Sequence, residues 1–100
     1  MNRPFYSEYV RHCMRYYARN TNKPRFFNTE VDGNNWYACH RAIERYSERD
    51  KDILISVYGE YDTIADNVYK VATLYCIDQS IIWDMMKEFE RSVAKKRGLI

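Results

Sequence analysis

The 100-residue sequence has few of the residues that interrupt regular secondary structure, with only three glycines and two prolines. A protein made of many short strands needs frequent turns, and turns depend on these two residue types. Long hydrophobic runs are also missing, and residues 1–13 lack the apolar segment of a signal peptide. These absences argue against a β-rich, secreted or membrane-spanning protein, and we expect a cytoplasmic one.

Cysteine is scarce and widely spaced. Cys13, Cys39 and Cys76 are odd in number and form no CxxC motif, which favours free thiols in a reducing compartment. His12–Cys13 and Cys39–His40 lack the usual spacing of zinc ligands, because adjacent residues on a helix point about 100° apart. The sequence also has no Gly-rich phosphate loop, HExxH or GxSxG motif. We therefore expect no metal, no cofactor and no enzymatic activity.

Charge is unevenly distributed although the formal net charge is only +2. Residues 1–25 carry six basic residues and one acid, residues 26–80 carry five and ten, and residues 81–100 carry five and three. Basic ends around an acidic middle are compatible with a surface that faces phosphates. The length and the hydrophobic content of 46% fit one domain over residues 1–100.

Apolar residues at steps of three and four predict an all-α fold, a small bundle of about five helices. We expect helices over residues 3–19 and 35–46, with a loop over 21–35 whose Asp32–Gly33–Asn34 reads as a turn. Two segments, Ser47–Asp50 and Thr63–Asp66, have the form of capping boxes and predict two further helix starts. Gly59 would end the first of these helices as a left-handed C-cap. Asp78 would cap a last helix that ends near Gly98.

The predicted helix over residues 3–19 allows two interpretations. Its tyrosines and arginines could form a nucleic-acid-binding arm in which aromatic rings stack on bases. The helical period instead favours a core-facing stripe, with Arg11 and the other charged residues largely off it; the stripe consists of Tyr6, Tyr9, Val10, Cys13, Tyr16 and Tyr17. We take the second reading and treat residues 1–45 as a helical scaffold.

The last two helices, within Thr63–Arg97, have the outline of a helix-turn-helix, the motif that places its second helix in the DNA major groove. An inward apolar stripe leaves a polar face on the last helix; we expect the stripe to consist of Ile82, Met85, Met86, Phe89 and Val93. On that face we expect four residues to read bases: Gln79, Ser80, Trp83 and Lys87. Four residues further along would hold phosphates: Arg91, Lys95, Lys96 and Arg97.

Two simpler interpretations stay open. The last helix could be an ordinary amphipathic helix of the bundle, with Lys87–Glu90 and Glu88–Arg91 as surface pairs. Trp83 could belong to the core rather than to the polar face, because tryptophan is usually well buried.

Three consecutive segments resemble region 4 of the bacterial sigma-70 factors and of phage and plasmid regulators that borrow it: ERDKDILISVYG, TIADNVYKVATLYCID and QSIIWDMMKEFERSVAKKRGL. The matching positions include Tyr46–Asp50, Val57–Gly59 and Thr63–Ala65, and the resemblance covers about residues 46–98. Asp84, Glu88 and Glu90 stand where that family is richer in arginine.

The resemblance implies a DNA-binding transcriptional regulator of sigma-like helix-turn-helix type. Its partners would be duplex DNA and, in some such proteins, RNA polymerase or a second copy of the chain. Nothing in the sequence resembles the promoter-melting regions of a full sigma factor. The alternative is a non-enzymatic protein-interaction module, RNA-polymerase-associated or self-associating, and its basis is the tyrosine-rich first helix, the acidic middle and the modest net charge.

Overall fold

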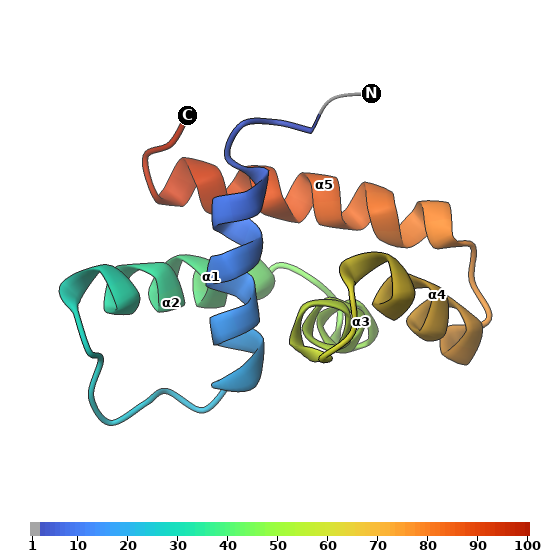
Figure 1. The fold of residues 1–100 in the computed structure, drawn as a ribbon, viewed down its shortest axis with the longest axis horizontal. Helices are drawn as coiled ribbons and strands as arrows, with labels where there is room; N and C mark the ends of the chain where they lie inside the picture. Colours follow the sequence, from blue (N-terminus) through green and yellow to red (C-terminus); the bar gives the residue numbers. More distant parts are fainter. Residues whose placement is uncertain (1–2) are drawn as a thin grey trace.

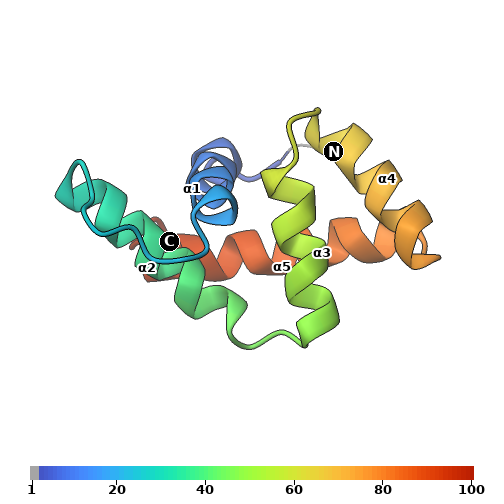
Figure 2. The same ribbon diagram turned by 90° about the horizontal axis from the view of Figure 1, so that it is seen from below.

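The computed structural model describes residues 3–100, which form five α-helices and no strand. The helices are α1 (Ser7–Arg19), α2 (Glu30–Ile43), α3 (Glu48–Gly59), α4 (Ile64–Tyr75) and α5 (Gln79–Lys96). Helix α5 lies along one side of the molecule, α1 crosses in front of it, and α2, α3 and α4 lie beneath it (Figure 1). The view from below shows α2 and α4 on opposite sides of α3 (Figure 2). The predicted all-α class is confirmed.

One buried cluster receives side chains from all five helices. Each helix contributes at least one fully buried residue to this cluster, for example Val10, Cys39, Leu54, Val68 and Phe89. Each side chain of this kind contributes roughly 1.5–3 kcal/mol when it leaves water. The helices are therefore held by a shared core, in which α1 packs against α2, α3 and α5.

Helix α1 buries most of the predicted stripe, but one of its arginines also turns inward. Tyr6, Val10 and Tyr17 are buried, as the spacing predicts, whereas Tyr9 is 39% exposed and Tyr16 is only partly buried. Arg11, which we expected largely off the stripe, has a side chain only 12% exposed. It lies inside because the carboxylate of Glu90 on α5 provides a buried partner for its charge.

Helix α2 begins earlier than predicted, so the loop over residues 21–35 is too long and Asp32–Gly33–Asn34 is not a turn. The helix starts after Thr29, whose hydroxyl accepts a hydrogen bond from the amide of Asp32 at 3.1 Å. Gly33 lies inside the helix beneath the ring of Phe27, where an added Cβ would approach Cδ2 to 3.1 Å. A tertiary contact therefore explains the glycine that the local sequence presents as a turn residue.

The predicted N-caps of α3 and α4 are present, although neither capping box shows the return bond that the cap amide would donate to the Asp carboxylate among the described residues. Ser47 accepts from the amide of Asp50 at 3.2 Å, and Thr63 accepts from that of Asp66 at the same distance. The prediction for Gly59 is wrong, because its φ is not positive and it is the last helical residue of α3. A Cβ at Gly59 would lie 3.2 Å from the Cβ of Ala18, so the glycine allows α1 and α3 to approach closely.

Among residues 3–100, no helix has both the length and the apolar character needed to cross a membrane.

Candidate nucleic-acid interface

Helices α4 and α5 are joined by a tight connection over residues 76–78. Cys76 ends α4 in the left-handed conformation, with φ 57° and ψ 45°. The amide of Ile77 then donates to the carbonyl of Ala72 at 3.0 Å, which closes the end of the helix. A left-handed residue at this point is the place where many helix-turn-helix units use glycine. The connection thus has the short length of the turn that joins the two helices of a helix-turn-helix unit.

Asp78 occupies the N-cap position of α5, as predicted, with an extended backbone. Its carboxylate, however, makes no capping hydrogen bond. The first turn of α5 therefore has no side-chain acceptor for its free backbone N–H groups among the described residues. Such groups at a helix N-terminus favour an incoming anion.

One stripe of α5 is buried against the other helices. Ile82, Met86, Phe89 and Val93 are each at most 1% exposed, and they match most of the predicted inner stripe. Met85, which we also assigned to that stripe, is only partly buried. The opposite face of α5 is left to solvent along most of its length.

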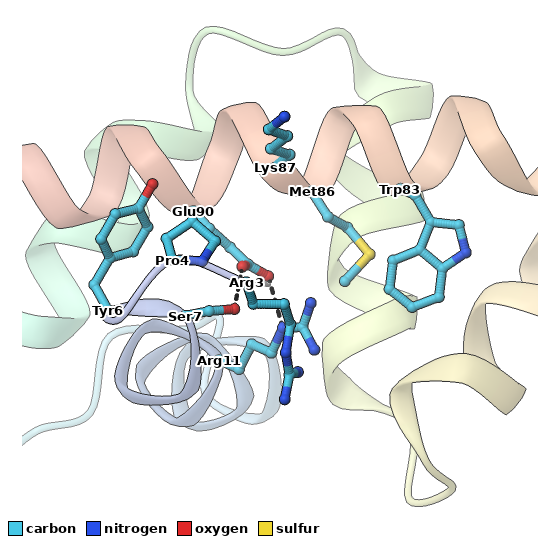
Figure 3. A pocket seen from close by; sticks show the side chains of 9 residues that line it. All are labelled: Arg3, Pro4, Tyr6, Ser7, Arg11, Trp83, Met86, Lys87 and Glu90. Carbon is cyan, nitrogen blue, oxygen red and sulfur yellow. Dashed lines mark hydrogen bonds and ion pairs between the residues drawn. The ribbon is translucent and has the colours of Figure 1, made fainter. Parts of the chain in front are cut away.

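The predicted base-reading residues do not all lie on that free face. Gln79, Ser80 and Lys87 are exposed, and Lys87 also lines the edge of the neighbouring pocket (Figure 3). Trp83 is partly buried and points into that pocket together with Met86. Each of the two interpretations of Trp83 is therefore partly correct. The ring packs against the core, as expected of a core residue, but one side of it stays open, as expected of a residue on the polar face.

The pocket beside Trp83 has a volume of about 410 Å³ and lies between the N-terminal part of α1 and the middle of α5 (Figure 3). The guanidinium of Arg11 is 6.0 Å from the centre of the Trp83 ring. A second hollow of about 370 Å³ also borders Arg3, Arg11 and Trp83 and extends to the start of α4 at Thr63. The two hollows form a groove beside the N-terminal half of α5.

Two of the three arginines that line this groove have carboxylate partners. Arg3 pairs with Glu8 at 2.6 Å, and Arg11 pairs with Glu90 at 3.0 Å. Arg15 lines the far end of the groove and is exposed, without an ion pair among the described residues. The groove is thus only weakly basic, and the predicted phosphate ligands lie elsewhere.

The four predicted phosphate-binding residues diverge at the end of α5. Arg91 and Lys95 are exposed on the same helix as the base-reading candidates. Lys96 is exposed but lines a hollow against α2, and Arg97 donates from Nε to Oδ1 of Asn35 at 2.6 Å. Arg97 also lines that hollow, whereas Lys95 is not part of its lining, so the run Lys95–Arg97 is divided between two surfaces.

Acidic side chains share the exposed face of α5. Asp84 and Glu88 are exposed, one turn apart, between Ser80 and Arg91. They would repel phosphates, but a carboxylate can also accept a hydrogen bond from the amino group of cytosine. Asp84 therefore belongs among the candidate base-reading residues, and we did not identify it from the sequence.

Glu90 is a buried residue of the core, so the expected surface pair between Lys87 and Glu90 is not formed. Its side chain is 6% exposed and accepts hydrogen bonds from Ser7 Oγ at 2.9 Å, Arg11 Nε at 3.0 Å and Tyr58 Oη at 2.6 Å. Burial and the neighbouring carboxylate raise the pKa of Tyr58 well above its usual value. The carboxylate thus fixes α5 to α1 and α3.

His40, Cys13 and Cys39, which belong to the two His–Cys pairs, lie among packed side chains of the fold. Nδ1 of His40 lies 2.9 Å from Tyr17 Oη, and its ring stacks on Trp36 with centroids 4.8 Å apart. Burial raises the pKa of Cys13 to about 11 and that of Cys39 higher still, which makes both thiols poor nucleophiles. Across residues 3–100, no three His, Cys, Asp or Glu side chains are grouped to hold a metal ion.

Comparisons with known proteins give no further identification: no protein-family model, curated protein or solved structure matches the chain.

Proposed function

We propose that the protein is a DNA-binding transcriptional regulator in which α4 and α5 act as a helix-turn-helix on duplex DNA. The observation that carries the proposal is the division of α5 into two faces. One face is buried against four other helices, while Gln79, Ser80 and Lys87 remain free at the N-terminal half. A recognition helix must satisfy both of these demands at once.

The turn and the resemblance to sigma region 4 support the same proposal. The left-handed Cys76 ends α4 only three residues before α5 begins, and α3 packs against both helices as a third member of the unit. In this arrangement Gln79 pairs with adenine, Lys87 reaches a guanine or a phosphate, and Asp84 accepts from cytosine. Arg91 and Lys95 hold the backbone on the side of the same groove.

The test is a binding titration of a labelled random-sequence duplex, followed by selection of preferred sequences. The double variant Gln79→Ala/Lys87→Ala should lose sequence preference, because each bidentate base contact contributes about 1–3 kcal/mol of discrimination. The matched control Arg45→Ala removes one exposed charge outside α5 and should retain the preference. If the wild-type protein shows no binding to duplex DNA even at low salt, the proposal is wrong.

A second candidate function is a protein-interaction module, whose partner would be RNA polymerase or a second copy of the chain. Two apolar side chains near the α4–α5 turn favour it: Leu74 is 76% exposed and Ile81 is 46% exposed. Light scattering distinguishes self-association directly. A dimer that the Leu74→Ser/Ile81→Ser variant abolishes, in a protein that does not bind DNA, would favour this second function.

A further inference from the structure

A small polar cavity of about 200 Å³ lies between α2 and the end of α5. Its wall is made of six residues: Asn34, Tyr37, Ala38, Arg41, Lys96 and Arg97. Three of the six are cations and none is an acid. Glu44, which follows Arg41 by three positions, pairs with Nε2 of His40 at 3.3 Å instead. Among the described residues, no carboxylate forms an ion pair with Arg41, Lys96 or Arg97.

A fourth cation extends this basic surface. Nζ of Lys23 lies 5.3 Å from the centre of the Tyr37 ring, and the guanidinium carbon of Arg41 lies 6.0 Å from the same centre. Two positive groups thus lie near the Tyr37 ring, which itself lines the cavity. Like charges held together without a counter-charge repel each other, and a bound anion would remove that cost.

We propose that this cavity binds a phosphate group. Arg41 offers a planar guanidinium fork that matches two phosphate oxygens, and Lys96 adds a point charge. Arg97 gives its Nε to Asn35 and keeps its terminal nitrogens for a ligand. The side chains of Asn34 and Tyr37 can donate further hydrogen bonds. This set of donors fits a compact, multiply charged oxyanion.

The phosphate can belong to a nucleic-acid backbone or to a small free phosphate compound. The cavity lies at the opposite end of α5 from Gln79, a separation of about 27 Å for an 18-residue helix. Its chemistry is therefore independent of base reading at the N-terminal half, and the site does not require the proposed function to hold.

The experiment follows backbone amide NMR signals while sodium pyrophosphate is added at constant ionic strength. We expect saturable shifts concentrated at Asn34, Tyr37 and Lys96. The variant Arg41→Gln/Lys96→Gln should weaken binding about tenfold or more, because it removes two charge-assisted contacts. The matched control Arg45→Gln/Lys70→Gln removes the same residue types outside the cavity and should bind as the wild type does.

Shifts that are absent, that do not saturate, or that persist in the cavity variant would overturn the site. Circular dichroism verifies that both variants are folded. If the double variant does not fold, the single variant Lys96→Gln takes its place in the titration. A parallel titration with random duplex DNA identifies the source. If the backbone is the ligand, the cavity variant lowers the salt slope of log K by about two relative to the wild type. An unchanged slope with pyrophosphate binding lost would leave the site standing as one for free phosphate.

Discussion

The hydroxyl of Tyr58 donates to Oε2 of Glu90 at 2.6 Å and so joins α3 to α5 inside the core. The same carboxylate accepts from Ser7 and from Arg11 of α1. One buried charge therefore connects the N-terminal helix, the third helix and the candidate recognition helix. The partners are far apart in sequence, so the network forms only when the chain is folded.

Loss of the Glu90 carboxylate should strongly destabilise the protein. Glu90→Ala would leave Arg11 buried without its counter-charge, which costs about 3–5 kcal/mol when one partner of a buried pair is removed. Urea unfolding measures the change. The control Glu88→Ala removes an exposed acid from the same helix and should change stability by less than about 0.5 kcal/mol. Equal effects of the two substitutions would show that the buried network does not stabilise the fold.

Stability should fall at alkaline pH. Burial raises the pKa of Cys13 from 9.0 to about 11 in the folded protein, and it also raises that of Tyr58. Below pH 9 the Cys13 thiol is protonated in both states and contributes no pH dependence. Between pH 9 and 11 the unfolded chain releases this proton while the folded chain keeps it, so the free energy of unfolding decreases. For Cys13 the loss is on the order of 2–3 kcal/mol by pH 11.

Unfolding by urea at a series of pH values checks this expectation. The variant Cys13→Ala removes the thiol and should flatten the decline between pH 9 and 11, although it lowers stability at neutral pH by opening a small void. A decline of the same steepness in the variant would assign the alkaline effect to other groups.

Substitution of Cys76 by glycine should stabilise the turn. Cys76 is exposed and adopts a left-handed conformation that costs a non-glycine residue roughly 1–2 kcal/mol. Glycine removes that cost but gains freedom in the unfolded chain, so we expect a net gain below about 1 kcal/mol. Thermal unfolding measures it. The control Cys76→Ala retains a Cβ and should give no gain; equal midpoints for the two variants would refute the strain argument.

The helix starts could be predicted from the sequence where the deciding interaction is local. Ser47 and Thr63 cap the helices that follow them, and each accepts from an amide only three residues away. Thr29 caps α2 in the same way, because it accepts a hydrogen bond from the amide of Asp32. The segment Asp32–Gly33–Asn34 has the composition of a turn, however, and the sequence predicts one there. Its helical state depends on Phe27 packing over Gly33, and periodicity does not reveal that contact.

The candidate site could be predicted only in part, for a similar reason. The apolar period of α5 correctly places Ile82 and Phe89 inside and leaves Lys87 outside. It does not reveal that Glu90 meets Arg11, a residue 79 positions away, or that Arg97 turns toward Asn35. From the sequence alone, a charged residue is assigned to the surface, because the distant partner that allows its burial is not yet known.

Trp83 offers a direct test of where DNA binds. Trp36 is buried and only 3% exposed, whereas Trp83 keeps one side open beside the candidate recognition face. In the variant Trp36→Phe, acrylamide should quench the remaining fluorescence, and a saturating duplex should reduce that quenching several-fold because DNA along α5 covers the ring. The variant Trp36→Phe/Gln79→Ala/Lys87→Ala, at the same DNA concentration, should show less protection. Binding detected by anisotropy with unchanged quenching of Trp83 would place the DNA on another surface and refute the assignment to α5.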